Sequence, residues 1–128
     1  MRSRMIVMPA LAVLVGAVGG CVPQPAPPTA ATGAQLTDAI GGKSYVGTMP
    51  DGSAVCVYHA PDGRFLGRAD GLVSGRWTIE DDSLCYAYAV GPDRPDCRQV
   101  VTQGDRVAFV FAELVIGLGR LTEGNVCA

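Results

Sequence analysis

The residues best suited to chemistry in this chain of 128 residues are five cysteines and a single histidine. The cysteines are Cys21, Cys56, Cys85, Cys97 and Cys127, and no two of them form a Cys-x-x-Cys pair. Zinc sites usually take such closely spaced thiolates or several histidines, and a reactive thiol needs a neighbour that lowers its pKa. We therefore expect neither a metal site nor a catalytic thiol.

Hydrolytic chemistry would have to use His59, the only imidazole in the chain. The nearest serine in sequence is Ser53, and no Gly-x-Ser-x-Gly elbow occurs. Most of the carboxylates fall in expected turns, where aspartate is common for conformational reasons: Asp51, Asp62, Asp70, Asp81, Asp82, Asp93, Asp96 and Asp105. No glycine-rich phosphate loop links a strand to a helix. The residues therefore favour a protein that is not an enzyme and takes no cofactor, with a hydrolase as a remaining alternative.

The first twenty residues have the layout of an export signal. Two arginines precede an uncharged apolar stretch from residue 5 to residue 18, and Val18-Gly19-Gly20-Cys21 closes it with small residues. This tetrapeptide resembles the lipobox of bacterial lipoproteins. The resemblance implies a signal peptide over 1–20, cleavage after Gly20 and acyl chains on Cys21 that hold the protein on a membrane. The alternatives are an ordinary signal peptide, or an uncleaved anchor with an incidental cysteine.

The compartment follows from the same resemblance. Val22, rather than an aspartate, follows the cysteine. By the sorting rule of the lipoproteins that the chain resembles, this implies the outer membrane, with the protein facing the periplasm.

Residues 21–34 are expected to be a tether. They contain four prolines, no charge and no aromatic side chain, so they have little to bury against a core. A polyproline-like spacer is the expected structure, and a PxxP ligand for another protein is the alternative.

Residues 35–128 are expected to form one all-β domain. A short helix is expected between Thr32 and Gly42, because Leu36 and Ile40 share a face and Gly41-Gly42 ends it. Short apolar runs then alternate with turns such as Asp51-Gly52. They predict strands at 44–49, 53–60, 64–68, 72–79, 83–90, 97–103, 106–112 and 115–121. Tight turns between consecutive strands favour an antiparallel meander or an eight-stranded barrel. The last two strands are apolar on both faces, which predicts that they are central in the sheet or are covered by the short helix or the chain ends.

The cysteines other than Cys21 form an even set, and an oxidising compartment favours two disulfides. Four cysteines allow three pairings. We favour Cys85–Cys97, which lie in consecutive strands around one loop, and this leaves Cys56–Cys127 to join an early strand to the chain end.

Three short motifs carry a further resemblance: Gly75-Arg76-Trp77, the pair Cys85 and Cys97, and Gly124-Asn125. With this strand pattern, the domain resembles small lipocalin-like and inhibitor-like barrels of bacterial envelopes. The resemblance implies a fold and a compartment, but no particular activity.

Aromatic side chains and one loop are the candidates for a binding surface. Four tyrosines and the tryptophan could line a barrel mouth or form a contact patch, although aromatic residues in so small a domain are commonly core: Tyr45, Tyr58, Tyr86, Tyr88 and Trp77. The loop 91–96 carries Arg94 between two prolines and could enter a partner's cleft, or could be a plain hairpin loop.

Charge and anchor together define the expected partners. The formal net charge is −2 and Lys43 is the only lysine, so no basic footprint for nucleic acid exists. The expected function is a lipid-anchored, non-catalytic binding module for an envelope protein or a polymer such as a glycan, with an inhibitor as one form. The alternative is a structural or stress-related envelope component without a discrete ligand.

Overall fold

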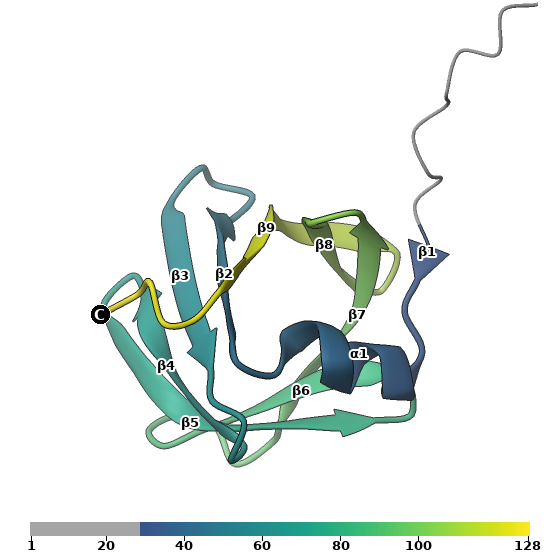
Figure 1. The fold of residues 1–128 in the computed structure, drawn as a ribbon. Helices are drawn as coiled ribbons and strands as arrows, with labels where there is room; N and C mark the ends of the chain where they lie inside the picture. The colour runs from purple at the N-terminus through teal and green to yellow at the C-terminus, as the bar shows by residue number, and fades with distance from the viewer. Residues whose placement is uncertain (1–28) are drawn as a thin grey trace, which may run out of the picture.

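The computed structural model describes residues 29–128, so the expected signal peptide and Cys21 lie outside the described residues. The described chain is one short helix and a closed antiparallel β-barrel of eight strands, which confirms the predicted fold class (Figure 1). In chain order the elements are β1 (Thr29–Ala30), α1 (Gly33–Ile40), β2 (Lys43–Thr48), β3 (Ala54–His59), β4 (Arg64–Ala69), β5 (Leu72–Glu80), β6 (Ser83–Tyr88), β7 (Asp96–Gln103), β8 (Arg106–Phe111) and β9 (Leu114–Glu123).

The barrel is a meander whose last strand returns to its first. Each strand from β2 to β9 pairs with the next in antiparallel register, and β9 closes on β2, where Tyr45 lies opposite Leu121. Closure leaves no open edge among these eight strands, which removes a site for unwanted strand pairing. The predicted strands agree with the observed ones, although several ends differ by one or two residues.

The helix α1 closes one end of the barrel. Its Leu36 and Ile40 are fully buried, and α1 contacts β5 and β2 (Figure 1). The end beside α1 also holds the β3–β4, β5–β6 and β7–β8 turns. We call it the closed end, and we call the opposite end, where β2 ends and β3 begins, the open end.

The folded domain begins before the expected boundary. Residues 21–34 were expected to be tether, but Thr29 and Ala30 pair with Thr102 and Val101 of β7. Ala31 is buried and its N–H donates to the Val100 carbonyl at 3.0 Å. β7 has free pairing positions here because β6 pairs only with its first three residues. The chain therefore docks on the barrel from residue 29 on.

Because Gly119 has no side chain, β9 can lie close to β2 and to the ring of Tyr45. A Cβ atom at Gly119 would lie 2.3 Å from the Val46 carbonyl oxygen and 2.7 Å from Cε2 of Tyr45. Tyr45 is one of the aromatic residues predicted to line a barrel mouth or to be core. Its ring is 2% exposed and lies over this backbone. Glycine in β9 is thus required by packing.

Two disulfides fasten the barrel, with the pairing that the sequence favours. Cys85 and Cys97 lie opposite each other in β6 and β7, with Cα atoms 4.0 Å apart. Cys56 of β3 joins Cys127, which ties the C-terminal segment to the barrel wall. Ser44 holds the same segment, since its hydroxyl donates to the Gly124 carbonyl at 2.6 Å.

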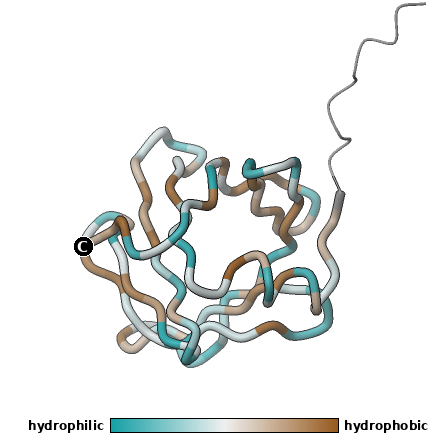
Figure 2. Tube along the Cα trace, in the orientation of Figure 1, coloured by the Kyte–Doolittle hydropathy of each residue, from teal (hydrophilic) through white to brown (hydrophobic). Residues whose placement is uncertain are grey.

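The outer faces of β8 and β9 are partly exposed. Both strands are largely apolar (Figure 2), and they were predicted to be central or covered. Each pairs with a strand on both sides, as a central strand does. Leu118 and Val115 on β9 are nevertheless more than half exposed, and α1 covers the barrel end rather than these strands. Within residues 29–128, no helix is both long and apolar enough to span a bilayer.

Candidate functional site

The interior of the barrel is filled at the closed end and partly hollow at the open end. At the closed end α1 packs Leu36 and Ile40 into the core with Trp77 and Leu84. Toward the open end lies a cavity of about 140 Å³. Valines and two phenylalanines form much of its wall, and a few polar side chains converge on it from β2, β6 and β7. A concave site of this composition is the usual form of a small-ligand site.

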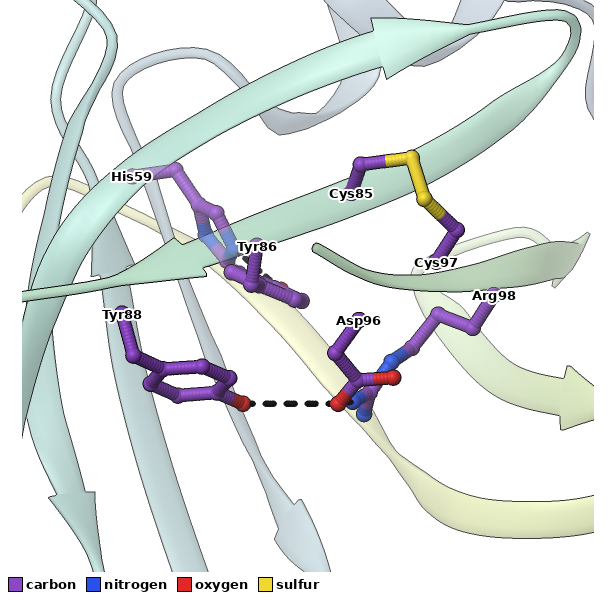
Figure 3. Close-up of polar contacts among 7 residues, drawn as sticks. All are labelled: His59, Cys85, Tyr86, Tyr88, Asp96, Cys97 and Arg98. Atoms are coloured by element: carbon purple, nitrogen blue, oxygen red, sulfur yellow. Dashed lines mark hydrogen bonds and ion pairs between the residues drawn. A yellow bond between two sulfur atoms is a disulfide. The ribbon is translucent and has the colours of Figure 1, made fainter. Parts of the chain in front are cut away.

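Arg98 is the central polar group of this cavity. It follows Cys97 on β7, so its side chain points inward while the disulfide points to the other face of the strand (Figure 3). The guanidinium carbon lies 5.2 Å from the ring centre of Tyr86 and 5.5 Å from that of Phe109. Cation–π contacts on both rings hold the cation in place.

Asp96 neutralises Arg98 from two residues away on the same face of β7. Its Oδ2 accepts a short hydrogen bond from the guanidinium Nη2 and a longer one, at 3.5 Å, from the Tyr88 hydroxyl (Figure 3). The Arg98 side chain is 12% exposed, whereas that of Asp96 is 41% exposed. The cation is therefore fixed inside the barrel, while its counter-ion lies at the mouth of the cavity.

One hydrogen-bond donor of Arg98 remains unused. Its Nε is buried and has no partner among residues 29–128. The hydroxyl of Tyr45, another residue that lines the cavity, is also buried and unpaired. Burial raises the pKa of Tyr45 to about 12, and the nearby charge of Arg98 opposes that rise. The two residues with a buried, unpaired side-chain N or O atom in the described part of the chain thus line one cavity.

Tyr86, which lines the cavity, forms a buried hydrogen-bonded pair with His59. His59 Nδ1 lies 3.2 Å from the Lys43 carbonyl oxygen, which can only accept, so Nδ1 carries the proton. Nε2 then accepts from the Tyr86 hydroxyl at 2.6 Å. Desolvation lowers the pKa of His59 to about 4 and raises that of Tyr86. Both groups are therefore neutral at physiological pH.

The structure brings together three of the predicted binding residues. Tyr45, Tyr86 and Tyr88 line the cavity, whereas Tyr58 on β3 does not. Trp77 lies at the closed end, where its Nε1 donates to the Ala60 carbonyl at 2.9 Å, and Arg94 is exposed on the loop between β6 and β7.

Arg98 and Asp96 were not predicted as site residues from the sequence. The available signal was the alternation Asp96, Arg98, Val100 along β7. It was overlooked because Asp96 was assigned to the preceding turn, so the inward face of that strand was not identified.

Two other clusters of reactive side chains offer no comparable site. Ser53 donates to Asp51 at 2.6 Å in an exposed turn, while both ring nitrogens of His59 are engaged elsewhere. Glu80 lies close to Cys85 and Cys97, but those two sulfur atoms are bonded to each other. A larger open groove of about 430 Å³ lies over β7, β8 and β9, and it contains neither of the two unpaired buried groups.

The chemistry available at the cavity is therefore hydrogen bonding within an apolar wall. Arg98 Nε–H and the Tyr45 hydroxyl are free donors, and the charges of Arg98 and Asp96 neutralise each other. Both ring nitrogens of His59 are already hydrogen-bonded. Comparisons of the chain with protein-family models, with curated proteins and with solved structures found no match.

Proposed function

We propose that this protein is a lipid-anchored component of the bacterial cell envelope that acts as a non-catalytic binding module for an envelope protein or polymer. Its binding site is the open end of the barrel. Support for the compartment comes from the lipobox-like Val18-Gly19-Gly20-Cys21 and from two disulfides, which persist in oxidising surroundings.

The observation that carries the binding role is the unpaired Nε of Arg98. A buried donor without a partner costs about 1–3 kcal/mol, and more when the group is charged. A domain of this size buries little surface and is only marginally stable. A core with a purely structural role would therefore be expected to contain no buried donor without a partner. A ligand that supplies an acceptor removes it.

The position of the chain entry fits this proposal. Thr29 pairs with Thr102, one residue before β7 ends at the closed end. A membrane anchor N-terminal to Thr29 would therefore join the domain at the closed end. The cavity would open at the other end, where a partner has access.

The anchor is tested on native protein from the membrane fraction. We expect intact mass spectrometry to find a chain that begins at Cys21 and carries acyl groups, and Cys21→Ser to release the protein from membranes. A chain that begins at Met1, or an unmodified Cys21, would remove the envelope assignment.

The binding role is tested by native mass spectrometry of the protein purified from envelope extracts. We expect a bound component whose retention falls at least tenfold in Arg98→Lys and is unchanged in Arg68→Lys, the same change at an exposed arginine on β4. Equal retention by both variants would exclude the open end as the site.

A further inference from the structure

The unpaired donor of Arg98 has a restricted direction. The guanidinium carbon lies over the rings of Tyr86 and Phe109, and Asp96 accepts a hydrogen bond from Nη2. The planar guanidinium carries its donors in a rigid fork, so these three contacts also restrict the direction of Nε–H. A ligand atom that satisfies it must be a hydrogen-bond acceptor, because an arginine has only donors to offer.

The charge of that acceptor is limited by Asp96. Arg98 and Asp96 together are neutral, so the site has no net charge for a ligand to balance. A carboxylate would bring a second negative charge beside Asp96, and an ammonium group would lie against Arg98. An uncharged oxygen meets neither penalty, and a carbonyl oxygen has two lone pairs, enough for Arg98 Nε and for a second donor.

The rest of the ligand is defined by the cavity wall. The apolar lining of the cavity, whose volume is about 140 Å³, includes Val55, Val57, Phe65 and Val73. Apolar protein cavities of about 150 Å³ are known to hold benzene. The space therefore suits a body the size of one small ring or a short branched chain.

We propose that the open end of the barrel binds an uncharged carbonyl group attached to a small apolar body, with the carbonyl oxygen accepting from Arg98 Nε and from the Tyr45 hydroxyl. Asp96 acts as a filter that keeps carboxylates out. This inference rests on the proposed binding role and specifies the chemical group that the site recognises, whether the group is free or belongs to a larger partner.

Three probes of similar shape test the chemistry on the purified full chain. Acetophenone carries the neutral carbonyl, ethylbenzene lacks the oxygen, and benzoate carries the charge. Calorimetric titration is expected to show saturable binding of acetophenone, with ethylbenzene and benzoate each at least tenfold weaker. Ethylbenzene binding as tightly as acetophenone, benzoate binding most tightly, or no binding of any probe would each overturn the proposal.

Substitutions at Asp96 and Arg98 separate recognition from folding. Asp96→Asn keeps a polar amide at the cavity mouth and removes the negative charge, so benzoate affinity is expected to rise at least fivefold while acetophenone affinity stays within twofold. Arg98→Lys keeps the charge without the Nε donor and is expected to weaken acetophenone at least tenfold. Thermal melting of each variant establishes that it is folded. A folded Asp96→Asn protein with unchanged benzoate affinity would refute the filter.

The second donor is tested by Tyr45→Phe, which removes only the hydroxyl. We expect acetophenone affinity to fall threefold or more and ethylbenzene affinity to stay within twofold. An equal effect on both probes would contradict a hydrogen bond from Tyr45.

Failure of this inference differs from failure of the proposed function. If an envelope component depends on Arg98 while acetophenone does not bind, the ligand chemistry is wrong and the binding role stands. If acetophenone binds as expected but native protein retains no envelope component, the binding role is wrong and the cavity chemistry stands.

Discussion

Acidification should destabilise this domain through one side chain, His59. The ring is fully buried, and desolvation lowers its pKa to about 4 from the ordinary 6.5. Below pH 6.5 the unfolded chain binds a proton on this ring that the folded chain does not take up until about pH 4. Stability therefore falls as pH falls through this window, since the unfolded state binds more protons.

The size of the effect follows from the two pKa values. Between pH 7.5 and pH 4.5, proton linkage with pKa values of 6.5 unfolded and about 4 folded reduces the free energy of unfolding by about 2.5 kcal/mol. That is a substantial part of the stability expected of a small domain.

Urea unfolding at several pH values measures this contribution. His59→Gln is the control, because it removes the only histidine and leaves every carboxylate in place. The difference in unfolding free energy between wild type and variant is expected to change by about 2.5 kcal/mol across the window. If the two pH profiles run parallel from pH 7.5 to 4.5, His59 is not held neutral by burial and the assignment of its hydrogen bonds fails.

Three further changes test other parts of the structure by urea unfolding at neutral pH. Gly119→Ala places a methyl group against the backbone of β2 and should cost about 1–3 kcal/mol, and full stability would mean that β2 and β9 lie farther apart. Tyr86→Phe leaves Nε2 of His59 without its donor and should cost about 1–3 kcal/mol, so a neutral effect would argue against that hydrogen bond. The double substitution Cys56→Ser and Cys127→Ser should lower the free energy of unfolding by about 4 kcal/mol, the loop-closure entropy expected for a loop of this length. An unchanged urea midpoint would show that this disulfide does not constrain the unfolded chain.

The strand pattern could be predicted because alternation and turn chemistry are local. Pairs such as Asp51-Gly52 mark the turns, and the apolar alternation between them marks the strands. Residues 29–34 escaped prediction because their docking depends on pairing positions of β7 that β6 leaves free, which no local pattern records.

The candidate site could be predicted only in part, for a geometric reason. Alternation gives the face on which a side chain lies, and it correctly groups Tyr86 and Tyr88. It does not give the level along the barrel axis, so Trp77 was grouped with them although it lies at the closed end. Asp96 and Arg98 were missed because aspartate is common in turns, so Asp96 was assigned to the loop although it is the first residue of β7.

Nuclear magnetic resonance of the arginine side chains tests the central claim most directly. The Nε–H signal of Arg98, identified by its loss in Arg98→Lys, is followed while acetophenone is added to the folded protein. We expect this signal to move saturably, and not to move on addition of ethylbenzene. An Arg98 signal that stays in place while acetophenone saturates signals elsewhere would show that the unpaired donor inside the barrel is not where this protein binds.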